Sequence, residues 1–417
     1  MRSKNKQLVL TMILLPVLAS LPALAGIIRV SPSGPIRSIK QAIEKAKPFD
    51  TIIVEKGIYK EGTIIVNKPV YLKGINYPVI DGENKYEIIT INSDQVTLDG
   101  FAVQHSGSSS YNDIAAIRIN NARKVTIRNN QLDDTFFGIY SQHAGSCLIT
   151  GNTIRSYPKT ELGSANGIHC WKSDSMQITN NKISGHRDGI YFEFVTASSI
   201  RNNYSHDNLR YGLHFMFSNK DIYDNNTFER NGAGVAVMFS KEVTMLNNKF
   251  LSNWGASSYG ILLKEISDSH IEHNDFSRNT TGIYLEGTTR IMVTKNHFNG
   301  NGYALRIQAS CNDNTILQNN FTGNTFDVAT NGSLVLNKFS RNYWDKYEGY
   351  DLNRDGVGDI PFRPVSMYSM VVERNPTAMM LFRSFLVNLF DKTEKMLPGL
   401  TPEGLRDDQP MMRSLKF

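Results

Sequence analysis

Residues 226–250 read NTFERNGAGVAVMFSKEVTMLNNKF. The stretch opens at Asn226 with an asparagine, one further residue and a phenylalanine, and the same phrase returns at Asn248. Between the two phrases lie short runs that alternate apolar and polar residues and are separated by Asn, Gly and Ser. Such runs are typical of short strands joined by tight turns. The interval leaves no room for a helix, so the stretch predicts one turn of a repeating β-structure.

The asparagine phrase recurs along most of the chain, and most of its steps are 22 or 23 residues. Its third residue is usually Phe, Ile or Leu, and it begins at Asn130, Asn152, Asn181, Asn226, Asn248, Asn274, Asn296, Asn319 and Asn337. Asn203 occupies the same position in the series, with Ser205 in place of the apolar residue. A second phrase, a small residue followed by an alternating strand, runs in phase with it from Gly138 to Ala304. Two series with one period indicate a repeat architecture.

This period predicts an all-β fold, namely a right-handed parallel β-helix whose turns of about 22 residues stack about 4.8 Å apart. A leucine-rich repeat would show a Leu-x-x-Leu-x-Leu consensus, and a propeller blade would need about 40 residues. The asparagines are expected to stack at a bend and to hydrogen-bond neighbouring turns through their amides.

The chain is predicted to have three parts. Residues 1–25 are typical of a signal peptide, with basic residues, a short apolar run and the small-residue site Ala23-Leu24-Ala25. Residues 26–343 form the β-helix and its N-terminal cap, an amphipathic helix over 38–46 that begins at Ser38. Residues 344–417 hold an Asp-rich loop, an apolar helix over 375–390 and a short tail. The mature protein is therefore expected in the periplasm.

Composition excludes two classes of protein. With 40% hydrophobic and 20% charged residues, the chain is not disordered throughout. Its formal net charge of +6 falls to +3 without the three basic residues of the leader, so no nucleic-acid partner is expected. The three cysteines, Cys147, Cys170 and Cys311, cannot all pair internally, which argues against a disulfide scaffold.

The second and fourth positions after each small residue should face outward in columns. This places His214, Met216 and Met238 on one face within two adjacent turns, with Glu193 one turn away and His169 two turns away. Imidazole and thioether groups suit copper, especially copper(I), better than zinc or calcium. The sequence thus predicts a copper site, with a protein-contact surface as the alternative for such a stripe.

The last part of the chain carries two further candidates. Oxygen ligands follow calcium-loop spacing at Asp351, Asn353, Asp355 and Asp359. Phe362 stands where a bidentate glutamate is expected, so a self-bonded Asx turn is the alternative to calcium. The apolar helix offers Met379, Met380, Phe382, Phe385, Leu386, Leu389 and Phe390. It either caps the solenoid or docks on a membrane-embedded partner, and an exposed end at Met411, Met412, Leu415 and Phe417 favours docking.

Some parallel β-helices cleave polysaccharides, and glycoside hydrolysis uses two carboxylates about 5 to 10 Å apart. Asp188 and Glu193, with His186 and Arg187 nearby, are the best pair on offer. The outward columns otherwise hold few acids. The chain is therefore predicted not to be an enzyme, with a secreted polysaccharide-active enzyme or carbohydrate-binding β-helix as the alternative.

Motifs at both ends of the solenoid are more specific than its repeats. The opening carries Asp50-Thr51-Ile52-Ile53-Val54 and Gly57-Ile58-Tyr59, and the end carries Asn342-Tyr343-Trp344-Asp345 and the Asp-rich loop up to Pro361-Phe362-Arg363-Pro364. With them the chain resembles the NosD family of periplasmic copper-binding β-helix proteins over nearly its whole mature length.

The resemblance implies a role in maturing the copper centres of nitrous oxide reductase. It implies that the β-helix is the periplasmic part of a complex with an ABC-type permease and a cytoplasmic ATPase, and that a copper chaperone is the donor of transiently held copper(I). Membrane association would then run through the permease alone, with the apolar tail as the docking element. An equally compatible expectation is a protein that binds chaperone and reductase in turn without ligating copper. The resemblance itself supplies no ligand residues.

Overall fold

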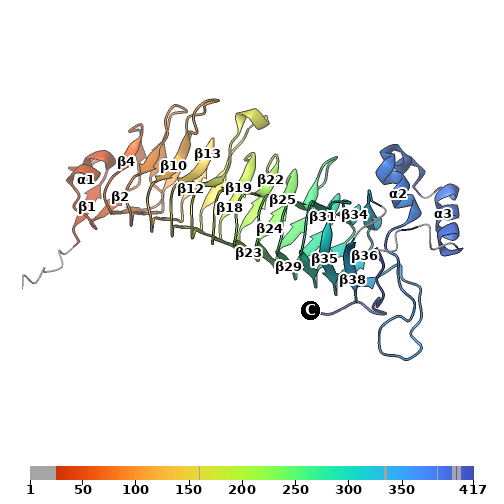
Figure 1. Cartoon of the computed structure of the whole chain (residues 1–417). Helices are drawn as coiled ribbons and strands as arrows, with labels where there is room; N and C mark the ends of the chain where they lie inside the picture. The colour runs from red at the N-terminus through yellow and green to blue at the C-terminus, as the bar shows by residue number, and fades with distance from the viewer. Residues whose placement is uncertain (1–24, 159, 333–335, 383, 397–400, 402–404) are drawn as a thin grey trace, which may run out of the picture.

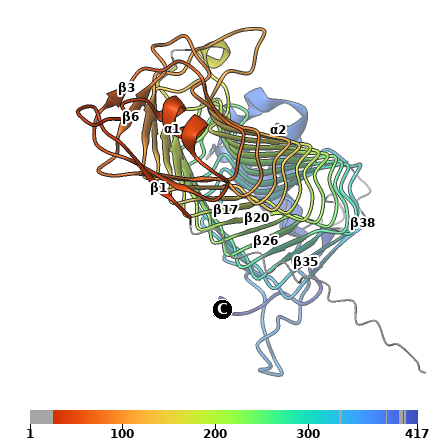
Figure 2. The ribbon, with the colours of Figure 1, turned by 90° about the vertical axis from the view of Figure 1, so that its left-hand side faces the viewer.

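A computed structural model describes residues 25–158, 160–332, 336–382, 384–396, 401 and 405–417. The predicted signal peptide over residues 1–25 lies outside the described residues except for Ala25. The chain winds into a parallel β-solenoid with three sheets along its length, so the predicted fold is confirmed (Figure 1). The view along the solenoid shows the turns stacked behind one another (Figure 2).

Each turn adds one strand to each sheet, and all pairings between successive turns are parallel. The first sheet has 14 strands: β1 (Ile27–Val30), β2 (Thr51–Val54), β5 (Tyr71–Gly74), β8 (Thr97–Asp99), β11 (Thr126–Arg128), β14 (Leu148–Thr150), β17 (Gln177–Thr179), β20 (Ser199–Arg201), β23 (Ile222–Asp224), β26 (Thr244–Leu246), β29 (His270–Glu272), β32 (Met292–Thr294), β35 (Asn312–Leu317) and β38 (Leu336–Ser340). The second sheet has 12: β4 (Ile64–Val66), β7 (Ile89–Ile91), β10 (Ala115–Asn120), β13 (Phe137–Gln142), β16 (Ile168–Trp171), β19 (Asp188–Glu193), β22 (Tyr211–Met216), β25 (Ala233–Met238), β28 (Tyr259–Lys264), β31 (Thr281–Glu286), β34 (Tyr303–Ile307) and β37 (Phe326–Thr330). The third sheet has 13: β3 (Ile58–Tyr59), β6 (Val79–Asp81), β9 (Ala102–Gln104), β12 (Gln131–Asp133), β15 (Thr153–Arg155), β18 (Lys182–Ser184), β21 (Tyr204–His206), β24 (Thr227–Glu229), β27 (Lys249–Leu251), β30 (Asp275–Ser277), β33 (His297–Asn299), β36 (Asn320–Thr322) and β39 (Tyr343–Trp344).

The repeated phrase builds the interior. Its apolar residue points inward, and successive rings stack, for example Phe250 on Phe276 with centroids 4.7 Å apart and Phe321 on Trp344 at 4.1 Å. These rings are fully buried. The apolar core therefore runs the length of the solenoid as a continuous stack, which is how a repeat that cannot bury its own face becomes stable.

The asparagine side chains form the predicted ladder between turns. Asn248 Oδ1 accepts hydrogen bonds from the backbone N of Asn226 at 2.9 Å and from its Nδ2 at 3.0 Å, and the same pair recurs along the series. The prediction was wrong at its last member. The ladder continues from Asn319 to Asn342, whereas Asn337 accepts from Asn314 in a different column. Both asparagines begin a similar phrase, and only the 23-residue step to Asn342 matches one full turn.

Both ends of the solenoid are closed by the chain itself. At the start, helix α1 (Ile39–Lys45) begins after Ser38, whose Oγ accepts from the N of Gln41 at 3.2 Å. At the other end, Asp407 Oδ2 accepts from the N and the Nδ2 of Asn342 and from Trp344 Nε1, each at 3.0 Å. Asp407 therefore takes the place of the next asparagine of the ladder.

The apolar segment after the solenoid is not the single helix predicted over 375–390. The structure has α2 (Met367–Arg374), a 3-10 helix (Pro376–Leu381) and α3 (Phe385–Met396). The chain leaves helical geometry at Phe382, where ψ is 131°. Tyr368 and Val372 of α2 pack on Phe326 of the second sheet. Among the described helices, none is both long and apolar enough to cross a membrane.

The extreme C-terminus is attached to the solenoid, and the expectation of an exposed apolar end holds for Phe417, whereas Met411, Met412 and Leu415 are half-buried. Leu415 exchanges two hydrogen bonds of 2.9 Å with the side chain of Asn320, and the N of Met411 donates to the O of Asn342 at 2.9 Å. The ring of Phe417 lies 4.7 Å from that of His297. The backbone of the tail thus finds hydrogen-bond partners along the last turns.

Burial disfavours the charged form of one carboxyl group in the interior. Asp221 is fully buried, its Oδ1 accepts from the N of Ser198 at 2.8 Å, and its Oδ2 has no described partner. Burial raises the pKa of Asp221 to about 8. Its folded pKa thus exceeds its unfolded value of about 4, so its contribution to stability is present at acidic pH and declines as the pH rises toward 8.

We therefore expect Asp221→Asn to stabilise the protein at pH 7 by roughly 1 to 3 kcal/mol and to have little effect at pH 4. The substitution retains an acceptor for Ser198, and Asn314 and Asn337 already occupy this column in later turns. Urea unfolding at the two pH values measures the difference. A variant that is less stable at pH 7 would contradict the expectation.

Candidate metal site on the second sheet

The outer face of the second sheet brings four of the five predicted ligands together. Met216 and Met238 are register partners on β22 and β25, and Glu193 on β19 is the partner of Met216 on the other side. His214 lies two residues before Met216 on the same outer face. Both methionines are half-buried, so their thioethers are accessible from solvent. The predicted alternation therefore places His214, Met216 and Met238 side by side.

His214 is oriented by a buried carboxylate. Its Nδ1 makes a long contact of 3.5 Å with Asp188 Oδ2, outside good hydrogen-bond geometry, while its Nε2 is buried and has no hydrogen-bond partner among the described residues. A carboxylate on one ring nitrogen and a vacant second nitrogen are typical of a metal-binding histidine, once the proton is assigned to Nδ1. His214 faces outward as predicted, but Tyr191 and Tyr211 pack on its ring and bury it.

Asp188 is held as a charged group by its neighbours. Its two oxygens accept from Arg210 Nε at 2.9 Å and from Arg210 Nη2 at 2.6 Å. Burial by itself would raise the pKa of Asp188, but the hydrogen bonds from His214 and Arg210 outweigh it and hold the pKa below its usual value. The carboxylate is therefore ionised at neutral pH and can polarise the His214 ring.

Tyr191 donates a hydrogen bond to a predicted ligand. Its hydroxyl lies 3.4 Å from Met216 Sδ. Burial raises the pKa of Tyr191 to about 12, so the phenol remains protonated and is a donor. The two thioethers and the neutral imidazole form a soft donor set that fits copper(I). Within the described ranges there is no cluster of three or more His, Cys, Asp or Glu that could hold a metal.

His169 lies apart from this group. The ring of Tyr191 stands between the two imidazoles, with centroids 4.7 Å from His169 and 4.8 Å from His214. His169 is buried, and burial lowers its pKa to about 3. Two rungs, or about 9.6 Å, separate the histidines, which is too far for one ion to bind both. The turn-by-turn prediction grouped them because it could not see the intervening ring.

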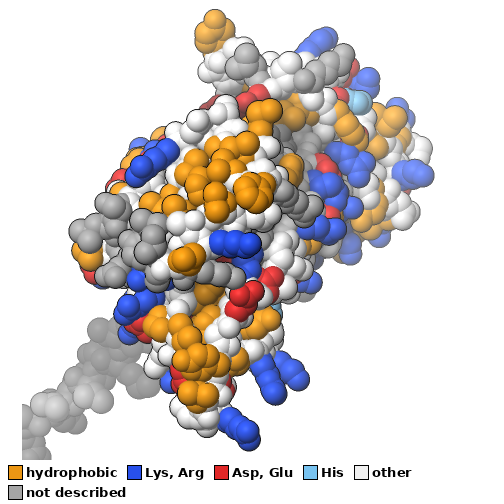
Figure 3. All heavy atoms as spheres, turned by 90° about the vertical axis from the view of Figure 1, so that its right-hand side faces the viewer, with side chains coloured by type: hydrophobic (Ala, Val, Ile, Leu, Met, Phe, Trp, Pro, Cys, Tyr) orange, Lys and Arg blue, Asp and Glu red, His pale blue; other side chains and the backbone are white. Residues whose placement is uncertain are grey.

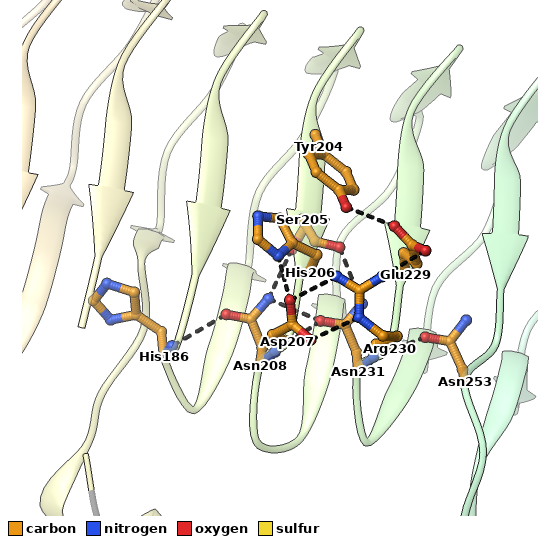
Figure 4. A network of polar contacts seen from close by, with 10 residues as sticks. All are labelled: His186, Tyr204, Ser205, His206, Asp207, Asn208, Glu229, Arg230, Asn231 and Asn253. Carbon is orange, nitrogen blue, oxygen red and sulfur yellow. Dashed lines mark hydrogen bonds and ion pairs between the residues drawn. The ribbon is translucent and has the colours of Figure 1, made fainter. Parts of the chain in front are cut away.

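The carboxylates considered for sugar cleavage do not form a pair. Asp188 and Glu193 are five residues apart on β19, about 16 Å along an extended strand. Asp188 is fully buried and bound to Arg210. The ring of His186 is buried, and its backbone N donates to Asn208, the start of a second asparagine ladder (Figure 4). This spacing does not match glycoside hydrolysis.

A polar network on the third sheet was missed in the sequence (Figure 4). Arg230 binds both oxygens of Asp207 at 2.9 Å and Glu229 at 2.6 Å, and Glu229 also accepts from the hydroxyl of Tyr204 at 2.5 Å. His206 bonds Asp207 and stacks under Tyr204 at 4.2 Å. The repeat of charged pairs 22 to 23 residues apart was the available signal. Because Arg230 neutralises Asp207 of the preceding turn and also binds Glu229, the network links adjacent turns.

The Asp-rich loop bonds to its own backbone. Asp351 accepts from the N of Asp355 and of Gly356, and Asp359 accepts from the N of Leu352 at 2.7 Å. Asn353 also accepts from the N of Asp355 at 3.1 Å. These are Asx-turn contacts, the predicted alternative to calcium. Calcium binding stays a prediction.

The C-terminal helical segment exposes most of the side chains predicted to dock. Those that face solvent are Met379, Met380, Phe382, Phe385, Leu386 and Leu389. Phe390 is half-buried and packs with Val387 toward Phe326 of the second sheet. The end view shows apolar side chains gathered on this part of the molecule (Figure 3). An exposed apolar patch of this kind is typical of an interaction site.

Solved structures define the class as a parallel β-solenoid. The surface adhesin PfbA of Streptococcus pneumoniae superposes with a TM-score of 0.55 at 13% identity, covering 70% of this chain and 87% of that one. The catalytic unit of a GH87 alpha-1,3-glucanase from Streptomyces thermodiastaticus strain HF3-3 also gives 0.55 at 13% identity, covering 78% and 70%. At this identity the likeness shows the fold alone.

Sequence comparisons are more specific. The family model described as "Periplasmic copper-binding protein (NosD)" matches residues 149–349. The "Probable ABC transporter binding protein NosD" of Stutzerimonas stutzeri is 26% identical over 378 residues, 85% of each chain. The protein of the same name from Pseudomonas aeruginosa is 26% identical over 373 residues, 84% of this chain and 86% of its own. Over most of its length the chain is similar to proteins named NosD, so the resemblance found in the sequence is confirmed.

Proposed function

We propose that this chain is a non-enzymatic periplasmic accessory protein that takes up copper(I) and passes it on during assembly of the copper centres of nitrous oxide reductase. The observation that carries the proposal is the register pairing of Met216 with Met238, with the buried imidazole of His214 two residues before Met216 on the same face. The description of the family as periplasmic and copper-binding supports it. A copper chaperone would be the donor and the reductase the acceptor.

Copper is the cargo in this proposal, and the donor set is suited to transfer. Two thioethers and a neutral imidazole carry no net charge, so they select a soft monovalent ion over zinc or calcium without holding it as tightly as thiolates. The half-buried position of both methionines leaves the ion accessible to a second protein. Asp188 would orient the ring of His214 through its Nδ1.

The test is copper(I) binding to a variant with both thioethers removed. Met216→Leu with Met238→Leu conserves volume, so the fold should persist while affinity for copper(I) falls by about 100-fold or more. Anaerobic competition with bicinchoninate measures the affinity. Met245→Leu, which changes a methionine buried inside the solenoid, is the matched control. Unchanged affinity in the double variant, or no uptake by the wild-type protein at micromolar copper(I), would contradict the proposal.

We also propose that the exposed side chains of the 3-10 helix and α3 bind an ABC-type permease that works with a cytoplasmic ATPase. The name of both relatives, ABC transporter binding protein, supports this partner. Met380 is 90% exposed and Phe385 is 82% exposed. Exposing these apolar side chains to water is unfavourable, and burial at an interface would remove that free-energy cost. The helices pack on β37, which is four strands, or about 19 Å, from β25 in the same sheet. The proposed copper site and the helices that carry the docking surface thus contact the same sheet.

Membrane fractionation tests this docking. Met380→Ser with Phe385→Ser is expected to lower the membrane-bound fraction of the protein about tenfold or more in cells that contain the permease. Tyr111→Ser, at an aromatic residue 97% exposed near the other end, is the control. Point variants are preferable to a truncation, because the tail also supplies Asp407 to the solenoid. Undiminished membrane binding would overturn this part of the proposal.

A further inference from the structure

Three phenylalanines form an exposed row beside the methionine pair. Phe194, Phe217 and Phe239 directly follow β19, β22 and β25. Their rings stack with centroids 5.1 Å apart at each step and interplanar angles of 8° and 14°. They are 45%, 39% and 42% exposed. We call these three residues the phenylalanine ridge.

The fold does not require phenylalanine at these positions. All three residues have left-handed backbones, with φ of 54°, 50° and 52°, a conformation that bulky side chains disfavour and that Asn and Gly tolerate. Neighbouring turns place polar residues or glycine in the same column, namely His143, Lys172, Glu265 and Gly287. The ridge thus combines an unfavourable backbone with exposed apolar area in three consecutive turns. Such a combination is characteristic of a functional surface.

The ridge is continuous with the proposed copper ligands. Phe217 follows Met216 and Phe239 follows Met238 in the chain, so each rung presents a thioether and a ring next to each other. Ion pairs flank the ridge, with Lys264 Nζ 3.1 Å from Glu286 and Lys220 Nζ 3.9 Å from Glu242. An apolar centre surrounded by charged side chains that pair with one another is the arrangement of a transient protein interface.

We propose that the phenylalanine ridge is the docking surface for the protein that exchanges copper(I) with Met216 and Met238. The inference rests on the proposed function. An ion passes directly between two proteins only when both ligand sets contact it at once, so the donor must cover the surface next to the methionines. The partner is therefore a copper(I)-carrying protein with an apolar hollow beside its own metal ligands.

Other occupants fit the ridge less well. A sugar ring packs on the face of an aromatic side chain, and here the ring faces are used against one another while the edges point outward. A bilayer needs a broad apolar surface, whereas the ridge is two steps, or about 10 Å, long and is bordered by charged side chains. A narrow ridge matches a groove on a folded protein.

The test is a variant that removes the rings but suits the backbone. Phe217→Asn with Phe239→Asn places residues that favour left-handed φ, so the fold should be retained or stabilised, which thermal unfolding checks. Glu265→Asn, in the same column at a φ of 52°, is the matched control. The probe is the purified periplasmic copper chaperone of the same organism, used copper(I)-loaded and copper-free. Stopped-flow measures transfer, calorimetry measures complex formation, and bicinchoninate competition measures copper affinity.

We expect the double variant to bind the chaperone at least tenfold more weakly and to take copper from it at least tenfold more slowly. Its affinity for copper(I) from bicinchoninate should remain within twofold of wild type, and Glu265→Asn should change neither quantity. Equal transfer by wild type and double variant would overturn the ridge proposal. Complex formation that depends on the ridge, without copper uptake by the wild type, would instead support the ridge and contradict the methionine site.

Discussion

Asp407→Ala is expected to destabilise the last turns of the solenoid by about 3 kcal/mol or more. Asp407 Oδ2 receives the backbone N and Nδ2 of Asn342 and the indole Nε1 of Trp344, all buried and each at 3.0 Å. An alanine leaves three buried donors without an acceptor, and each such donor costs about 1 to 3 kcal/mol. Solvent does not replace the carboxylate, because Asp407 is fully buried.

Because a solenoid is stabilised turn by turn, the loss should be local. Hydrogen exchange of the amides in β38 and β39 is the appropriate measurement, and it should accelerate there while the amides of β19 and β22 remain protected. Asp407→Asn is the control. It keeps the acceptor for Asn342 and Trp344 and loses only the oxygen that accepts from the N of Gln409 at 3.0 Å, so it should cost about 1 kcal/mol, less than the alanine variant. Unchanged protection of β38 in the alanine variant would show that the ladder ends without this cap.

Arg210→Met is expected to destabilise the protein by about 3 kcal/mol at pH 7. The substitution removes both guanidinium hydrogen bonds to Asp188 and leaves that carboxylate buried with only His214 beside it. Breaking one partner of a buried ion pair costs more than replacing both partners by neutral groups. The double variant Asp188→Asn with Arg210→Met should therefore recover part of the lost stability.

The pH dependence gives a second measure of the same pair. In the wild type, burial would raise the pKa of Asp188, but His214 and Arg210 hold it below its usual value. Its stabilising contribution is thus present above about pH 4 and is lost as the pH falls below that value. In Arg210→Met the buried charge becomes unfavourable, so the deficit relative to wild type should shrink between pH 7 and pH 4. Urea unfolding at pH 7, 5 and 4 tests this, and a deficit that grows on acidification would contradict the assignment.

The fold could be predicted because its hydrogen-bond partners recur at one sequence interval. Asn226 and Asn248 are one turn apart in the chain and hydrogen-bonded to each other, so the period of the sequence repeat equals the length of one structural turn. The same alternation placed Met216 and Met238 as neighbours. The prediction was wrong at Asn337, where two columns carry a similar phrase. A residue belongs to the ladder only if it lies one full turn after the previous member, and Asn342 rather than Asn337 does so.

Contacts that cross turns in other ways were not predictable. Tyr191 separates His169 from His214 because the rings of adjacent turns pack against one another. The sequence pattern places the three residues in one column but does not show how their side chains pack. Asp407 lies 65 residues after Asn342 and shares no repeat phrase with it, yet it completes the ladder. The break before α3 also followed from tertiary packing, since Val387 and Phe390 turn toward Phe326.

The amino-acid sequence by itself determined the solenoid, its period, the inward and outward faces and the family, because each of these depends on residues repeated at a constant spacing. Only the tertiary structure decided which outward side chains are exposed and which are covered. His214 is buried although it faces outward, and Phe217 is exposed although it is apolar. The reason is that exposure depends on the size and stacking of neighbours one turn above and below, and on the backbone conformation at each corner, neither of which the spacing of residues specifies.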